Sequence, residues 1–233
     1  MITVKIADLP IGIDNKFSYL LTLAEEYACD CEPVFTVSVS SDEIEREREQ
    51  CETVSSDGYL ESIVAYRKIA ELLPKYGAFV FHGAVLNVDG RAYAFTARSG
   101  VGKTTHTRLW LSEFGTRVHY LNGDKPVIRF IDGVPYAFGT PWRGKEGYGV
   151  NESAQLMGIA LLERASENSA DVIDARDGVM RLIGQIYLPK NPESAVLTMR
   201  LADELLKKVK FVELRCNMER EAAHVAYRAL TCD

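Results

Sequence analysis

The feature that most constrains the fold is a glycine-rich stretch, Gly100-Val101-Gly102-Lys103-Thr104, which lies between a strand pattern and a helix pattern. Residues 91–96 before it form an apolar, β-prone segment, and a helical segment begins near Gly102. Because glycine has no Cβ, the backbone can adopt positive φ and turn its amides toward an anion. The start of the helix adds partial positive charge. The sequence therefore predicts a phosphate-binding loop in a strand-loop-helix unit.

Each polar residue of this loop has an expected role. Lys103 can span the β- and γ-phosphates of a nucleotide, and the Thr104 hydroxyl can hold Mg²⁺. The strict motif has glycine where this chain has Ala97, and alanine would cost about 1 kcal/mol if that position needs positive φ. The alternative is a glycine-rich turn with an incidental lysine. The residues expected to bind the nucleotide are Ser99, Gly100, Val101, Gly102, Lys103, Thr104 and Thr105.

A carboxylate follows the next apolar strand pattern, at 118–121. Asp124 lies in the sequence Asn-Gly-Asp-Lys, where it could hold Mg²⁺, orient an acceptor hydroxyl or act as a base. The alternative is an ordinary turn aspartate, since Asn-Gly-Asp favours turns. His82 lies in an apolar strand pattern at 79–88 and, taken alone, would be interpreted as a core histidine.

A second glycine-rich segment, residues 139–147, carries two cations and an aromatic residue. Arg143 or Lys145 could bind the acceptor or stabilise charge on a transferring phosphoryl group. A solvated turn with Trp142 packed beneath it explains the same residues.

Hydrophobic periodicity predicts an α/β fold with a mixed sheet and flanking helices, without a linker that divides the chain. We expect one kinase-like domain over 1–233, with an N-terminal α/β part at 1–77, a nucleotide core at 78–165 and a helical part at 166–233. The expected strands are 2–6, 34–39, 79–88, 91–96, 118–121, 127–131, 134–138 and 157–162, with hairpin turns at Asp89-Gly90 and Asp132-Gly133. The expected helices are 19–28, 43–50 with serine caps, 62–73 ending at Pro74 and Gly77, one from 102, 178–187, 194–208 and 219–230.

Composition excludes several partners. The net charge of −6 disfavours duplex nucleic acid and anionic membranes, although a local basic pocket remains compatible with it. Five cysteines with no C-x-x-C pair make a disulfide framework or a structural zinc site a poor expectation. The N-terminus lacks a basic region followed by an apolar stretch, so we expect a cytoplasmic protein.

Taken together, two passages of this chain resemble a known family. The sequence FHGAVLNVDGRAYAFTARSGVGKTTHT, followed by YLNGDKPVI, resembles the catalytic domain of HPr kinase/phosphorylase and, more remotely, the nucleotide core of phosphoenolpyruvate carboxykinase. The resemblance covers roughly residues 79–165. Both families carry a histidine on the strand before a hairpin that leads into a Ser-Gly-x-Gly-Lys loop, which implies that His82 is a site residue. Both also carry an acidic pair after the next core strand, where this chain has Gly123 and Asp124.

The resemblance implies the phosphoenolpyruvate carboxykinase/HPr kinase type of P-loop fold and an ATP- and Mg²⁺-dependent kinase. The expected reaction transfers phosphate to a hydroxyl, foremost a serine of a protein or peptide. The expected catalytic residues are Asp124, His82, Arg143 and Lys145, and the expected metal contacts are Thr104 and Asp124. Two alternatives are a small-metabolite kinase and a non-catalytic nucleotide-binding module, which the missing second acid favours. Homo-oligomerisation and reversal of the reaction stay open.

Overall fold

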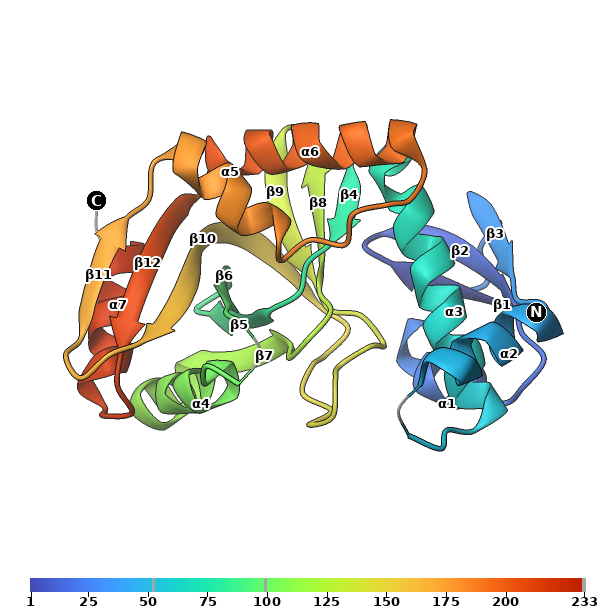
Figure 1. The fold of residues 1–233 in the computed structure, drawn as a ribbon, viewed down its shortest axis with the longest axis horizontal. Coiled ribbons are helices and arrows are strands. Elements are labelled where there is room, and N and C mark those ends of the chain that lie inside the picture. The colour runs from blue at the N-terminus through green and yellow to red at the C-terminus, as the bar shows by residue number, and fades with distance from the viewer. Residues whose placement is uncertain (52, 99, 232–233) are drawn as a thin grey trace.

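Two separate β-sheets organise the chain (Figure 1), which a computed structural model describes over residues 1–51, 53–98 and 100–231. The smaller sheet has the strand order β1-β2-β3, with β1 and β2 antiparallel and β2 and β3 parallel. Its helices pack beside it to form an N-terminal unit. The elements of this unit are β1 (Ile2–Ile6), β2 (Leu9–Asp14), α1 (Tyr19–Leu23), β3 (Phe35–Ser38), α2 (Ser41–Gln50) and α3 (Asp57–Leu72).

Strand β2 is missing from the sequence prediction because it contains Pro10 and Gly12, two residues that weaken a strand pattern. Proline is tolerated here, opposite Lys5 in the β1–β2 hairpin. A Cβ on Gly12 would approach the Thr36 hydroxyl to 2.5 Å, so the glycine permits close pairing with β3.

The helices of the N-terminal unit begin at serine caps. Ser40 and Glu43 form a reciprocal capping box at the start of α2, in agreement with the predicted serine caps. Helix α3 begins earlier than predicted, because the Ser56 side chain accepts a hydrogen bond from the Tyr59 amide. The helical segment ends at Gly77, which has φ of +70° and follows Pro74 as expected.

The larger sheet has nine strands over the described residues, and β10 is its central strand because it pairs with three others. Strand β10 pairs in parallel with β6 and β12 and antiparallel with β9, and the strand order is β4-β8-β9-β10-β6-β5-β7, with β12 and β11 continuing from β10. Its strands are β4 (Ala78–Val80), β5 (Ala84–Val88), β6 (Arg91–Thr96), β7 (Val118–Asn122), β8 (Val127–Ile131), β9 (Val134–Phe138), β10 (Ser153–Arg164), β11 (Ser169–Val172) and β12 (Lys210–Cys216).

Both predicted hairpin turns are confirmed. Asp89 and Gly90 have φ of 51° and 83°, and Asp132 and Gly133 have φ of 49° and 76°, as a two-residue turn with two positive φ values requires. These turns join β5 to β6 and β8 to β9.

Helices cover both faces of the larger sheet (Figure 1). Helices α5 (Ala175–Ile183) and α6 (Pro192–Leu206) pack on one face, and α4 (Lys103–Phe114) and α7 (Glu221–Thr231) pack on the other. Strands β5 and β6 send alternate side chains to these two layers. Val85 and Ala94 join the core under α5 and α6, whereas Leu86 and Phe95 join the core around Trp110 of α4. The predicted mixed α/β fold with flanking helices is confirmed.

The single strand predicted at 79–88 is wrong, since the structure divides it into β4 and β5. The break at 81–83 is held from three sides: the amides of Phe81, His82 and Gly83 donate to the carbonyls of Pro126, Gln185 and Asp124. A side chain at Gly83 would meet the Phe81 ring at 2.3 Å. The break leaves His82 exposed, although its sequence neighbours are buried.

Within the described ranges, no helix is both long enough and apolar enough to cross a bilayer.

Candidate functional site

The predicted loop connects the end of β6 to the first turn of α4. Gly100 and Gly102 have φ of +78° and +120°, and a Cβ on either would meet nothing within 4 Å. The backbone conformation, rather than crowding, therefore requires glycine at both positions. Ala97 is buried and is not among the residues with positive φ, so the departure from the strict motif carries no strain. Ser99 lies outside the described residues.

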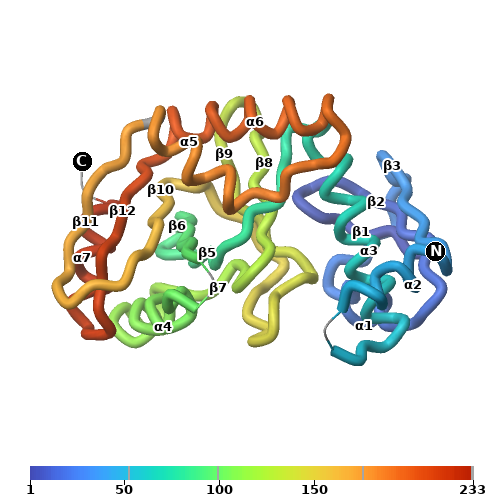
Figure 2. The backbone as a smooth tube through the Cα atoms, viewed as in Figure 1, coloured from blue at the N-terminus to red at the C-terminus, as the bar shows by residue number. Residues whose placement is uncertain are grey.

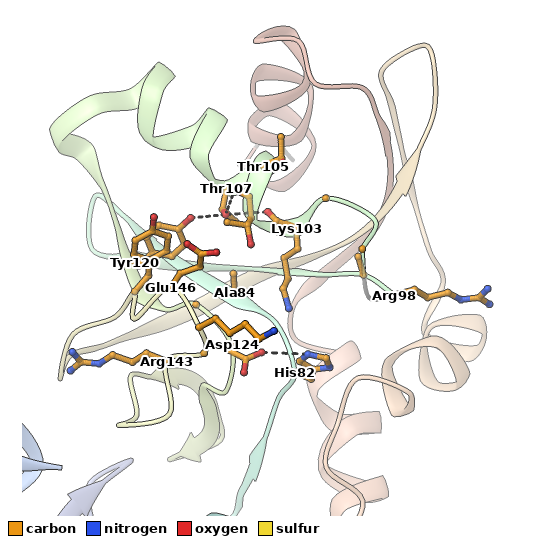
Figure 3. A pocket seen from close by; sticks show the side chains of 18 of the residues that line it. His82, Ala84, Arg98, Lys103, Thr105, Thr107, Tyr120, Asp124, Arg143 and Glu146 are labelled. Carbon is orange, nitrogen blue, oxygen red and sulfur yellow. Dashed lines mark hydrogen bonds and ion pairs between the residues drawn. The ribbon is translucent and has the colours of Figure 1, made fainter. Parts of the chain in front are cut away.

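The loop borders a cavity of about 520 Å³ (Figure 3). The N-cap residue of α4 is Gly102, which has no side chain that could accept a hydrogen bond from the first-turn amides. Val101 does not line this cavity, since its side chain packs against the core under α4 and α7. The predicted site residues that do line it are His82, Gly100, Gly102, Lys103, Thr104, Thr105, Asp124, Arg143 and Lys145.

Asp124 is positioned by the buried amide of Asn122, at the end of β7. The Asn122 Oδ1 atom accepts hydrogen bonds from the amides of Asp124 and Lys125, both at 2.8 Å. The Asn122 amide nitrogen donates to the carbonyl and hydroxyl of Thr140, and the Thr140 hydroxyl donates to the Lys125 carbonyl at 2.7 Å. This network fixes the turn so that the Asp124 carboxylate faces the cavity.

The structure brings Asp124 and His82 together. The His82 Nε2 atom lies 3.4 Å from Asp124 Oδ1, and the Lys125 amino group lies 3.3 Å from the same oxygen. Burial alone would raise the pKa of Asp124, but the His82 hydrogen bond and the Lys125 charge outweigh it and lower the pKa to about 2. Asp124 is therefore a carboxylate at neutral pH, and a weakly basic one.

Lys103 extends from the start of α4 toward the Asp124–His82 pair (Figure 3). Burial lowers its pKa, and the neighbouring Asp124 offsets part of that effect while Lys125 adds to it. The Lys103 amino group forms no hydrogen bond or ion pair with the described residues. A half-buried cation without a partner favours the arrival of an anion.

Gly123 occupies the position of the second acid in the resembling families. A Cβ at this position would lie 3.3 Å from the carbonyl oxygens of both Arg143 and Tyr148, and the Gly123 amide donates to the Tyr148 carbonyl at 2.8 Å. Main chain of Arg143, in the second glycine-rich segment, and of Tyr148, just after it, therefore fills the space that an acidic side chain would enter.

The second glycine-rich segment, residues 139–147, and residues 148–150 after it lie between α4 and the helices of the N-terminal unit (Figure 2). The Arg143 guanidinium pairs with Glu26 and lies over the Tyr27 ring, 5.9 Å from its centroid, so that it points away from Lys103 (Figure 3). Lys145 is exposed and makes no polar contact with the described residues. Gly144 has φ of +73°, and a Cβ there would meet the Asp124 Cβ at 2.8 Å.

Sequence reasoning missed Arg164, which contacts the phosphate loop and lines the same cavity. Its guanidinium donates to the carbonyls of Gly100 at 2.5 Å and Val101 at 2.9 Å. The predicted strand stopped at Leu162, whereas β10 continues to Arg164. No local pattern marks this contact, because it depends on the register of β10 beside β6.

An aromatic pair at the cavity wall was also missed. The rings of Tyr120 and Tyr148 stack at 4.6 Å, and the Tyr120 hydroxyl lies 2.7 Å from the Thr107 hydroxyl in α4. Arg108 of α4 donates to the Tyr148 hydroxyl and to Glu146. Through these contacts, Glu146 of the second glycine-rich segment and Tyr148 just after it are held against α4.

Comparisons with known proteins give limited information. No family model matches this chain, and no curated protein matches it. Among solved structures, the chain is similar to the Hpr(Ser) kinase/phosphatase from Coxiella burnetii, with 11% sequence identity and a TM-score of 0.30, over 52% of this chain and 92% of that chain.

Proposed function

We propose that this chain is an ATP-dependent phosphotransferase that moves the γ-phosphoryl group to a hydroxyl. One observation carries the proposal: a glycine loop with two positive φ values, a lysine that forms no hydrogen bond or ion pair with the described residues, and an ionised aspartate border one cavity. Polyphosphate binding and acceptor orientation need these groups within reach of one another.

The loop and Lys103 would bind the triphosphate. Because the N-cap residue of α4 is a glycine, it supplies no side-chain cap, and the amides at the start of the helix can donate to phosphate oxygens. The Lys103 cation loses solvation through burial and regains a charged partner when phosphate binds. Lys145, which lines the cavity, is an additional cation that could pair with the transferring group or with the acceptor. Arg143 could take that role only by leaving Glu26.

Thr104 and Asp124 are the residues that would hold Mg²⁺. A hydroxyl and a carboxylate border the same cavity, and these hard oxygen donors suit the ion. Among the described residues, no group of three or more His, Cys, Asp or Glu side chains could hold a metal. This pair fits Mg²⁺, because Mg²⁺ commonly takes one or two protein ligands and completes its shell with phosphate and water. The ion would supply charge neutralisation at the phosphates.

The low pKa of Asp124 favours an orienting role toward the acceptor. A carboxyl with a pKa of about 2 is a poor base at neutral pH, but phosphoryl transfer depends mainly on positioning and charge stabilisation. Asp124 would accept a hydrogen bond from the acceptor hydroxyl, and the exposed His82 beside it would pass the proton to solvent. The sequence prediction that the acceptor is a serine of a protein or peptide remains a prediction.

One observation favours a second candidate, a nucleotide-binding module without catalysis. The space for a second acid at Gly123 is filled by main chain, so Asp124 would have to serve alone. Only the phosphotransferase would transfer phosphate from ATP to an acceptor, so an assay of phosphate transfer distinguishes the two functions.

The test combines binding and transfer. Isothermal titration with ATP and Mg²⁺ should show binding that Lys103→Ala abolishes, whereas Lys75→Ala, which changes an exposed lysine that does not line the cavity, should leave it intact. Labelled ATP incubated with the protein and a cell extract should give label transfer only with active protein. Equal transfer by wild type and Lys103→Ala would refute the kinase proposal, and Lys103-dependent binding without transfer would support the module instead.

A further inference from the structure

A second cavity lies directly behind Asp124. It has a volume of about 600 Å³ and is bounded by α1, α3 and the second glycine-rich segment. Four residues border both this cavity and the phosphate-loop cavity: Asp124, Arg143, Gly144 and Lys145. Asp124 is therefore on the boundary between the two spaces, where an acceptor bound on one side could meet a phosphoryl donor on the other.

Aromatic rings form one wall of this second cavity. Tyr19 and Tyr59 contact edge to face at 6.0 Å, and Tyr66 lies 5.2 Å from the Trp142 ring. Tyr66 and Trp142 are buried, whereas Tyr19 and Tyr59 are 39% and 41% exposed. Two half-exposed tyrosines beside two buried rings offer a surface on which a flat, apolar ring can pack.

The opposite end of the cavity is charged. Lys125, Lys145 and Arg143 border it together with the single carboxylate of Asp124. Lys125 pairs with Asp124, and Arg143 pairs with Glu26. Lys145 makes no polar contact with the described residues. The unpaired cation favours an occupant with an acidic group.

We propose that this second cavity binds the phosphoryl acceptor, and that the acceptor is a small hydroxy acid with a flat ring. This inference rests on the proposed function. The volume lies within the roughly 300–1,000 Å³ typical of small-molecule sites. The ring packs on Tyr19 and Tyr59, the acidic group pairs with Lys145, and the hydroxyl faces Asp124.

The reaction balances without a further reactant. The acceptor oxygen forms a bond to the γ-phosphorus, and the bond between that phosphorus and the β–γ bridging oxygen breaks with its electron pair on ADP. The hydroxyl proton passes to the Asp124–His82 pair and leaves to solvent from the exposed imidazole.

Three matched compounds test which groups the cavity recognises. Phenyllactate has the ring, hydroxyl and carboxylate, lactate lacks the ring, and 1-phenyl-2-propanol lacks the acid. Saturation-transfer NMR titrations of the full chain, with Mg²⁺ and a non-hydrolysable ATP analogue, should give saturable binding of phenyllactate that is tighter than that of the other two. A blocked seryl tripeptide serves as the peptide arm.

Variants place the binding in this cavity. Tyr59→Ala and Tyr19→Ala should each weaken phenyllactate binding about three- to tenfold, the usual worth of an aromatic contact. Leu21→Ala is the matched control, because Leu21 is a 46% exposed residue of α1 that does not line the cavity, and its binding should equal that of wild type. Thermal melts check that each variant is folded.

Several outcomes overturn the inference: no saturable phenyllactate binding, equal binding of lactate, unchanged binding in both tyrosine variants, or preference for the seryl tripeptide. ATP titrations of wild type and Lys103→Ala separate this failure from that of the proposed function. If ATP binds in a Lys103-dependent manner while phenyllactate fails, only the acceptor assignment falls. If ATP does not bind, the proposed function falls.

Discussion

The Asp124 carboxylate should stabilise the fold, and Asp124→Asn tests this quantitatively. The substitution keeps the shape of the side chain but removes the charge that His82 and Lys125 face. The pKa of Asp124 is lowered from 3.8 to about 2. A tenfold change in proton affinity corresponds to about 1.4 kcal/mol, so the ionised carboxylate contributes about 2 to 3 kcal/mol to the free energy of unfolding.

The sign of the pH dependence follows from the direction of the shift. A carboxyl with a lowered pKa in the folded state stabilises the protein above its unfolded pKa, near 4, and loses that contribution as the pH falls toward 2. Asp124→Asn should therefore lower the melting temperature by about 5 to 10 °C at pH 7 in a chain of this size. The difference from wild type should shrink between pH 4 and pH 2.

Differential scanning calorimetry or urea unfolding across this pH range measures the effect. Asp132→Asn is the matched control, because it removes one exposed negative charge from the β8–β9 turn, at a position with φ of 49° that asparagine tolerates. The reasoning is refuted if Asp124→Asn is as stable as wild type at pH 7, or if its deficit does not diminish in acid.

Three further predictions concern the loop and its surroundings. Arg164→Ala should speed hydrogen exchange of the amides at 100–102 and weaken ATP binding several-fold, because two hydrogen bonds to loop carbonyls are lost; unchanged exchange would contradict it. Gly123→Ala should lower the free energy of unfolding by about 1 to 2 kcal/mol in urea, because its Cβ would crowd two carbonyl oxygens, and an unchanged midpoint would disprove this. Lys103→Met should raise the melting temperature of the ligand-free protein at neutral pH, because burial lowers the pKa of Lys103 and folding disfavours its charged form. The gain in melting temperature should vanish as the pH rises through 10.5. A Lys103→Met variant with a lower melting temperature than wild type at neutral pH would contradict this prediction.

Local patterns were sufficient for much of the scaffold. The hairpins at Asp89-Gly90 and Asp132-Gly133 follow from turn chemistry that acts over two residues. Strand β12 was not predicted, because Glu213 interrupts its apolar run, and this buried carboxylate is tolerated only through ion pairs with Arg181 and Arg215. Those partners belong to tertiary structure, which periodicity does not contain.

Some residues of the candidate site could likewise be predicted from local sequence, whereas others depend on contacts made in the folded chain. The glycine loop and the turn at Asp124 could be identified from neighbouring residues, and the resemblance placed His82 beside them. The pairing of Arg143 with Glu26 joins residues far apart in the sequence, and the contact of Arg164 with the loop depends on strand register. The second cavity combines α1, α3 and residues 141–147, so no single segment indicates it.

The alternation of β5 and β6 between two helical layers makes the geometry of the candidate site depend on strand register. These two strands connect the backbone at His82 to the loop at Gly100, and their side chains belong in turn to opposite cores. One residue inserted into β5 would exchange Val85 and Leu86 between the layers and displace His82 by about 3.3 Å along the strand. Insertions in these strands would therefore disrupt the two cores before they could reshape the site.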